Sequence, residues 1–199
     1  MDRRQVLVGA AKAAVLGAAV DAALAEPAGG AAGKSQSATG PDSSQLADLM
    51  VIQNLLAGSA WSADVGETAF QTNLYAEDAV MDLGGERGAV RGRAAVVGMI
   101  VNDGHKSARA DGMTHVAAQP FIRISGDKAV AVGYIQIIVT DPASPERSLA
   151  GSPAAHPLIT VRMTANRWEF ARREGRWQIT RRTIRAAPSP EALALLRDD

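Results

Sequence analysis

Histidine is the side chain in this sequence best suited to proton transfer, because imidazole titrates near neutral pH and its two nitrogens can accept and donate. The chain has three, and His115 heads the segment "THVAAQPFIRIS", whose Ala, Val, Ile and Phe residues predict a sheet strand. An imidazole on the apolar face of a sheet needs a hydrogen-bond partner, since burying it unpaired costs free energy. His115 is therefore a candidate general base that requires an orienting partner.

The other two histidines are in polar surroundings. His105 falls in an expected polar turn and His156 in the proline-rich segment 141–157, so we expect both to be solvated. Three separated histidines without carboxylates at ligand spacing argue against a metal site. The chain has no cysteine, which excludes disulfides and thiol chemistry. It also lacks a phosphate-binding glycine motif and a nucleophile elbow, so no cofactor is expected.

Charge and length restrict the classes of partner. The 199 residues include 21 Lys+Arg and 21 Asp+Glu, which gives a formal net charge of zero. Such a chain has no bulk attraction to nucleic acid or to an anionic membrane, so neither is an expected partner. The length predicts one domain with appendages.

The first residues, "MDRRQVLVGAAKAAVLGAAVDAALAEP", have a basic start, an Ala/Val/Leu/Gly run and a small-residue cleavage pattern. They predict an export signal over 1–25, of the twin-arginine type, and a periplasmic or extracellular protein. An uncleaved Ala-rich helix is the alternative. Lys12 and Asp21 within the run disfavour a lipid-spanning helix. Residues 26–42 are rich in Gly, Ala, Ser and Pro and predict a disordered linker.

Helical patterns precede strand patterns along the rest of the chain. The first helix should begin at Ser43 or Ser44, either of which can cap it. Its expected apolar face, read from three- and four-residue spacings, consists of Leu46, Leu49, Met50, Gln53, Leu56, Ala57, Ala60 and Trp61. The further expected elements are helices at 67–75 and 93–104, the latter ended by Gly104, strands at 77–84, 113–124, 128–140, 158–171 and 176–186, a brief strand or turn at 88–92, and a C-terminal helix in 188–199.

Helices followed by a long antiparallel meander predict an α+β domain over 43–187, with a curved antiparallel sheet wrapped around the N-terminal helices. Such a sheet encloses a pocket between its concave face and the helices. Pro120, inside the expected strand 113–124, is compatible with a bulge or bend, because proline cannot supply a ladder donor.

Three segments resemble the signatures of SnoaL-like proteins, which belong to the nuclear transport factor 2-like superfamily of cone-shaped α+β folds. They are "VIQNLLAGSAWSAD", "MTHVAAQPFIRISGDKAVAVGY" and "REGRWQITRR", and the resemblance covers residues 44–187. The branch most similar to this chain includes hexachlorocyclohexane dehydrochlorinase and, more distantly, scytalone dehydratase. Fold similarity of this kind is compatible with many unrelated activities.

The resemblance extends to individual residues. Ile52 is followed twelve positions later by Asp64, as in that branch, and the family's strand histidine corresponds to His115. Arg182 corresponds to an arginine five positions after the last-strand tryptophan. Because the family pairs this aspartate and histidine as a catalytic dyad, the resemblance implies that Asp64 is the partner of His115. Arg182 would then stabilise negative charge on a leaving group or an enolate.

The rest of the expected pocket follows from strand alternation. Gln119, which matches an amide position of the family, and Phe121 share the expected strand face of His115. Trp61 and Tyr134 are the other expected pocket residues. The tyrosine that several members carry on the first helix is Leu56 here, which argues against a dehydratase that uses two tyrosines as acids.

These features predict a cofactor-independent lyase or isomerase that removes a proton from a small, mostly apolar substrate. Two alternatives remain open: a binding protein for a small hydrophobic ligand, and a non-catalytic accessory subunit. The histidine–aspartate pair could also serve only to order the core. A homo-oligomer, most simply a dimer, is expected because an apolar convex sheet face is usually covered.

Overall fold

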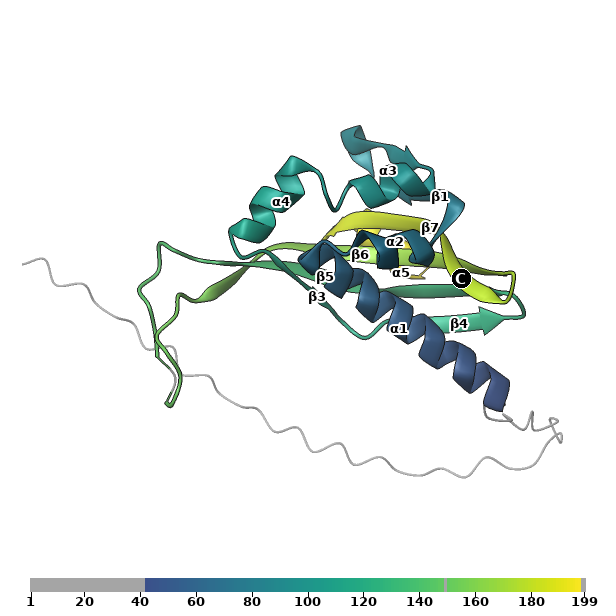
Figure 1. Ribbon diagram of the computed structural model, residues 1–199, viewed down its shortest axis with the longest axis horizontal. Helices are drawn as coiled ribbons and strands as arrows, with labels where there is room; N and C mark the ends of the chain where they lie inside the picture. Colours follow the sequence, from purple (N-terminus) through teal and green to yellow (C-terminus); the bar gives the residue numbers. More distant parts are fainter. Residues whose placement is uncertain (1–41, 149, 198–199) are drawn as a thin grey trace, which may run out of the picture. The chain divides into compact units, whose positions relative to one another are not determined.

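The computed structural model describes residues 42–148 and 150–197 (Figure 1). The expected export signal and all but the last residue of the expected linker lie outside the described residues. The elements follow in chain order: α1 (Ser43–Val65), α2 (Thr68–Leu74), β1 (Tyr75–Asp82), the 3-10 turn η1 (Gly85–Arg87), β2 (Ala89–Arg91), α3 (Arg93–Gly98), α4 (Asp103–Ala110), β3 (Thr114–Ala117), β4 (Phe121–Ser125), β5 (Lys128–Thr140), β6 (Leu158–Arg173), β7 (Arg176–Ala187) and α5 (Pro190–Arg197). None of the helices in the described segments has the length and hydropathy needed to cross a lipid bilayer.

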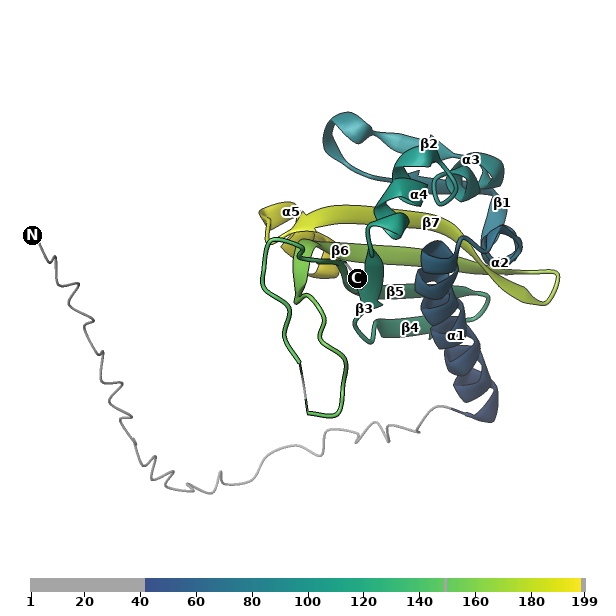
Figure 2. The same cartoon turned by 60° about the vertical axis from the view of Figure 1, so that its left-hand side comes forward.

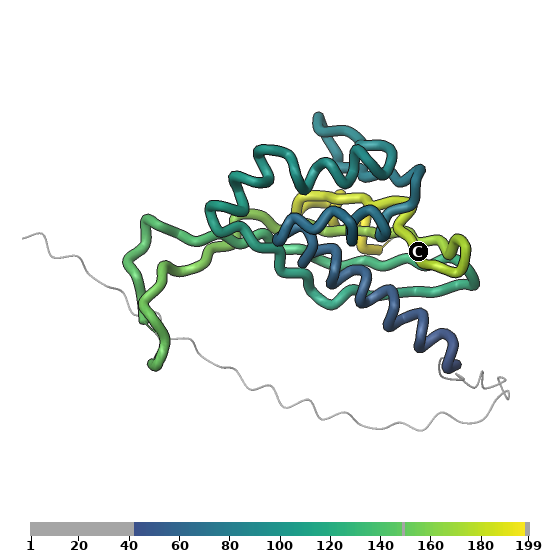
Figure 3. Tube along the Cα trace, viewed as in Figure 1, coloured from purple at the N-terminus to yellow at the C-terminus, as the bar shows by residue number. Residues whose placement is uncertain are grey.

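The seven described strands form one sheet in the order β2-β1-β7-β6-β5-β3, with β4 also paired to β5. Figure 3 shows the long strands β5, β6 and β7 running side by side. Neighbouring strands are antiparallel, except that β1 pairs with β7 in parallel. The sheet is therefore mixed, which corrects the expectation of a wholly antiparallel one. No hairpin joins β1 to β7, so no tight turn dictates their relative direction.

The two faces of the sheet are covered by different helices. The main core joins Ile52 of α1, Leu74 of α2 and Val96 of α3 to residues of one sheet face. On the opposite face, α5 buries Ala192 and Leu195 against Ala165 of β6. Figure 2 shows α1 crossing the strands on one side of the sheet, with α5 near the far end of β6 and β7.

The expected strand 113–124 is interrupted at residues 118–120. Ala117 of β3 pairs with Ile135, whereas Phe121 of β4 pairs with Val132. Four steps along β3 and β4 thus oppose three steps along β5, which reverses the alternation of faces. The bend that Pro120 suggested is present, and it turns Phe121 to the opposite face from Ala117.

Helix α1 begins at Ser43 as expected, but Asp42 caps it by accepting a hydrogen bond from the backbone N–H of Gln45 at 2.8 Å. The buried residues of the helix are Ile52, Leu56, Ser59, Ser62 and Ala63. The expected apolar face is therefore wrong at Leu46, Met50 and Trp61, which are exposed. Its other members include the buried Leu56 and the half-buried Leu49, Gln53 and Ala60. Apolar residues occur all around this helix, so their spacing alone did not identify the face toward the sheet.

The segment expected to form one helix over 93–104 contains the whole of α3, a turn and the start of α4. Asn102 caps α4 by accepting a hydrogen bond from the backbone N–H of His105 at 2.8 Å. Gly104 lies inside α4 rather than ending a helix. The residues of α4 are mostly polar and none is buried, so no apolar periodicity marked this helix.

Asp48 connects α1 to the β6–β7 hairpin, and its removal should destabilise the fold. Its carboxylate accepts hydrogen bonds from Arg172 and from the indole N–H of Trp177, the latter at 3.0 Å. We expect Asp48→Ala to lower the free energy of unfolding by about 1–3 kcal/mol, because a buried donor, the indole N–H, loses its partner. Asp127→Ala is the matched control, since Asp127 is an exposed partner of Arg172 and exposed pairs contribute little.

The same contacts predict a pH dependence. The hydrogen bond from Arg172, and then that from Trp177, hold the pKa of Asp48 below its ordinary value. The folded state therefore favours the ionised carboxylate, so this stabilisation is present above the ordinary carboxyl pKa and is lost as pH falls through the lowered one. Urea unfolding of wild type and Asp48→Ala should show a smaller difference at pH 3 than at pH 7. An unchanged difference at the two pH values would contradict this prediction.

Candidate active site

A cavity of about 480 Å³ lies between the sheet and the helices that cover it. Its wall combines side chains from α1, α2, α3 and α4 with side chains from one face of β1, β3, β5, β6 and β7. The polar residues that line it are Ser59, Gln71, Tyr75, Arg87, His105, His115, Arg162, Thr164 and Arg182. The other lining residues are alanine, valine, leucine, isoleucine and methionine, so the cavity suits a small, largely apolar molecule with a few polar groups.

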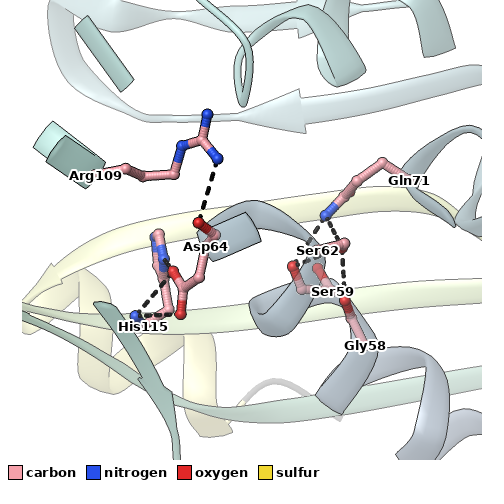
Figure 4. Close-up of polar contacts among 7 residues, drawn as sticks. All are labelled: Gly58, Ser59, Ser62, Asp64, Gln71, Arg109 and His115. Carbon is pink, nitrogen blue, oxygen red and sulfur yellow. Dashed lines mark hydrogen bonds and ion pairs between the residues drawn. The ribbon is translucent and has the colours of Figure 1, made fainter. Parts of the chain in front are cut away.

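The expected contact between Asp64 and His115 is present at one end of this cavity (Figure 4). Oδ1 of Asp64 lies 2.6 Å from Nδ1 of His115, and the two carboxylate oxygens accept the backbone N–H of His115 at 3.1 and 3.0 Å. The two side chains are only 15% and 20% exposed. Because an ionised carboxylate can only accept, Nδ1 carries the proton. Nε2 therefore holds the lone pair, and no described residue is its hydrogen-bond partner.

The end of α1 holds Asp64 in place. Gly66 ends the helix with φ of 76°, and Nη1 of Arg109 donates to the backbone carbonyl of Asp64 at 3.3 Å. A Cβ at position 66 would lie 2.5 Å from the same Nη1, so glycine allows both the left-handed turn and the close approach of the guanidinium. The geometry of Asp64 thus depends on α4 as well as on α1.

A second set of hydrogen bonds fixes α2 to the last turns of α1. Nε2 of Gln71 donates to the carbonyl of Ser59 at 2.9 Å and to Oγ of Ser62 at 2.7 Å. Ser62 in turn donates to the carbonyl of Gly58 at 2.6 Å (Figure 4). Gln71 and Ser62 are both buried, so these bonds satisfy polar groups that would otherwise destabilise the fold.

His105 lies beside His115 rather than in solvent, which corrects the expectation for this residue. The two rings are stacked, with centroids 5.9 Å apart and an interplanar angle of 14°. Burial lowers the pKa of His105, and the positive charges of His115 and Arg109 lower it further. A pKa held below the ordinary histidine value favours the neutral imidazole of His105. The unexpected helix α4 is what carries His105 to this position.

Arg182 lines the same cavity but at another part of its wall. Its Nε and Nη2 donate to Oδ1 of Asn166 at 3.1 and 2.8 Å, and its guanidinium lies 5.5 Å from the ring centre of Trp168. The backbone of Arg182 pairs with Trp168 of β6, which pairs with Ala131 of β5. His115 pairs with Ile137, six residues further along β5. Six residues span about 20 Å of strand. Arg182 and His115 would therefore contact different parts of a bound molecule.

Four expected pocket residues do not line this cavity. Trp61 is 54% exposed on α1 and packs edge-on against Phe70. Phe121 is 64% exposed on the other sheet face, because the interruption before β4 reverses the alternation. Tyr134 also lies on that face, where it packs against the cluster that contains α5. Gln119 lines a separate cavity of about 250 Å³ near Gln53 of α1.

Most residues that line the cavity were not expected from the sequence, and four of them carry a titratable side chain. Besides His105, they are Tyr75, Arg87 and Arg162. Tyr75 is 1% exposed, and no described residue forms a hydrogen bond with its hydroxyl. Arg162 shares a face of β6 with Thr164 by strand alternation. This alternation would have indicated Arg162 only if it had been known which face of β6 lies toward the cavity. The described residues contain no group of three or more His, Cys, Asp or Glu that could hold a metal ion.

Comparison with known proteins gives a family match over most of the described chain. The profile of the SnoaL-like domain matches residues 44–183. A search of curated proteins by sequence gives no match.

Solved structures support the same fold. An NTF2-like protein with a cystatin-like fold from Novosphingobium aromaticivorans is 27% identical, with a TM-score of 0.61 over 79% of this chain and 98% of that one. A protein of unknown function from Mycobacterium tuberculosis is 17% identical, with a TM-score of 0.59 over 77% and 80%. The hexachlorocyclohexane dehydrochlorinase LinA-type3 from Novosphingobium barchaimii is 19% identical, with a TM-score of 0.54 over 71% and 88%. At such identities the last two similarities establish the fold alone.

Proposed function

The chain belongs to the SnoaL-like domain family, and on this premise we propose that it is a cofactor-independent lyase or isomerase. In this proposal His115 removes a proton from a carbon atom of a small molecule bound in the cavity. The observation that supports it most directly is the hydrogen-bonded pair of Asp64 and His115, whose free Nε2 belongs to a residue of the cavity wall. A base that is oriented by a carboxylate in a largely apolar site is an arrangement suited to proton abstraction.

The proposed step conserves protons and electrons. The carbon-bound proton moves to Nε2 of His115, and Asp64 stabilises the resulting imidazolium through Nδ1–H. The electron pair of the broken C–H bond then either forms a double bond and expels a leaving group, or moves onto a neighbouring carbonyl oxygen to form an enolate. The first course is a β-elimination and the second leads to isomerisation. His105, held neutral, adds no positive charge that would oppose protonation of His115.

Deuterium exchange tests the proposal without knowledge of the natural substrate. The protein would be incubated in D2O with a panel of small ketones and of halogenated or hydroxylated cyclic compounds. Proton abstraction predicts that deuterium enters recovered substrate, or that an elimination product forms, as read by mass spectrometry. Absence of both over a broad panel, despite measurable binding of panel compounds, would count against the enzyme.

That outcome would favour the second candidate function, a binding protein for a small hydrophobic ligand. The mostly apolar wall of the cavity supports this alternative, because such a wall can hold a ligand whether or not a base is present. The two candidates differ in one measurement, since a binding protein has affinity but no turnover to lose.

We also propose that the chain forms a dimer through the sheet face opposite the main cavity. Val116, Phe121 and Leu158 lie on this face by strand register and are 44%, 64% and 61% exposed. Exposed apolar side chains gathered on one sheet face are typical of an interface. Light scattering at micromolar concentration should give the mass of two chains for wild type and of one chain for Phe121→Ser. Trp61→Ser, which removes an exposed aromatic ring from α1, should remain dimeric, and a monomeric wild type would refute the proposal.

A further inference from the structure

The cavity wall carries positive charge without matching negative charge. Arg87, Arg162 and Arg182 line it, and no aspartate or glutamate is among the described residues that do so. Asp64 faces His115 from behind the wall and its carboxylate is occupied by that residue. A bound molecule would therefore meet three guanidinium groups and no carboxylate.

Two of these arginines, Arg87 and Arg162, lack the ion pairs and hydrogen bonds that most other arginines of the described chain form. Arg93, Arg173 and Arg185 each form an ion pair with an aspartate or glutamate, at 2.9, 2.7 and 3.0 Å. Arg87 and Arg162 have neither an ion pair nor a hydrogen bond to any described residue, and both are exposed. Their donors are free for a ligand, whereas Arg182 already donates to Asn166.

The register of the sheet places Arg162 near the proposed base. His115 of β3 pairs with Ile137 of β5, which pairs with Arg162 of β6, and all three line the cavity. Neighbouring strands are about 4.8 Å apart, so the backbones of His115 and Arg162 are separated by roughly 10 Å. A few carbon atoms could bridge the space between Nε2 and the guanidinium.

We infer that the ligand of this cavity is a small apolar molecule that carries a carboxylate, and that Arg162, assisted by Arg87, binds this group. A guanidinium presents paired N–H donors that match the two oxygens of a carboxylate, and Arg87 and Arg162 keep these donors free. The apolar part of the ligand would pack against the isoleucine and methionine side chains of the cavity wall. The inference rests on the proposed function for the role of His115, but the binding itself does not require catalysis.

Calorimetric titration of matched ligand pairs tests the inference. The probes are benzoate, 2-naphthoate and 4-phenylbutanoate, each compared with its neutral amide of nearly the same size. We expect wild type to bind at least one carboxylate about tenfold more tightly than its amide, as a charge-assisted bond predicts. Equal affinity within all three pairs would overturn the inference.

Two variants test whether the preference for carboxylate depends on these arginines. The double variant Arg87→Gln/Arg162→Gln should lose most of the preference for carboxylate, while Arg91→Gln should keep it. Arg91 is a matched control because it is also exposed and without a described ion pair, but it lies on β2 outside the cavity wall. Circular dichroism would confirm that each variant is folded. A preference that survives in the double variant would also overturn the inference.

His115→Asn separates this inference from the proposed function. If the carboxylate is bound by the arginines, this variant keeps the preference although it lacks the base. Carboxylate binding without any proton exchange would refute the enzyme and leave the anion site intact. Proton exchange with neutral substrates, together with equal affinity within every pair, would refute the anion site and leave the proposed enzyme intact.

Discussion

The His115→Asn variant should turn over substrate about 100- to 10,000-fold more slowly than wild type, which is the usual contribution of a general base. Asparagine is the sharpest replacement, because its amide nitrogen occupies nearly the position of Nδ1 and can still donate to Asp64. The change removes only Nε2, the atom proposed to take the proton. The backbone N–H of residue 115 continues to donate to the Asp64 carboxylate.

The measurement compares turnover and ligand affinity in the same preparation. Affinity should change little, since Nε2 is one polar atom in a wall of many apolar ones. The matched control is His105→Asn, which alters the neighbouring cavity histidine but leaves the base and its partner in place. We expect the control to lose less than about tenfold, below the range for loss of a general base. A His115→Asn variant with wild-type turnover would show that another residue is the base.

The contact between Asp64 and His115 could be predicted from the sequence, because both residues occupy positions that match one family. The helix that bears Asp64 and the strand that bears His115 were both recognisable, and their resemblance to one family implied the pair before any contact was visible. The strand at 128–140 was similarly well marked, because a long apolar run follows the turn at Gly126. The strand at 176–186 follows the turn at Gly175. The α+β fold follows from such elements with little ambiguity.

The pocket residues were harder to predict, because each prediction depended on knowing which face of a helix or strand the side chain lies on. A single extra residue before β4 moved Phe121 to the opposite side of the sheet, and nothing in the alternation itself signals such a bulge. Tyr134 lies on β5 between two inward-facing positions, so only the register decides where it points. His105 was missed for a different reason, since the polar residues of α4 show no helical periodicity.

The Asp64→Asn variant tests the second half of the dyad, and its effect should approach that of losing the base. An asparagine at position 64 can still accept the backbone N–H of His115 through its carbonyl oxygen. With that oxygen in the place of Oδ2, the NH2 group takes the place of Oδ1 and faces Nδ1, which donates in wild type. The opposite orientation would set the NH2 group against the backbone N–H of His115. His115 can relieve the clash of the NH2 group with Nδ1 by moving its proton to Nε2, which removes the lone pair that the proposed reaction uses. In serine hydrolases the corresponding exchange lowers turnover about 10⁴-fold for this reason.

Asp64 acts through His115 rather than on the substrate, so a loss of turnover alone would not prove its role. The decisive readout is the tautomer of His115, which ¹⁵N chemical shifts distinguish at a pH where the ring is neutral. Wild type should carry the proton on Nδ1, and Asp64→Asn should shift it to Nε2. Asp103→Asn, a change to an exposed acidic residue of α4, should alter neither the tautomer nor turnover. If Asp64→Asn kept the proton on Nδ1 and still lost activity, the aspartate would serve the fold, because the orientation of the base would then not explain the loss.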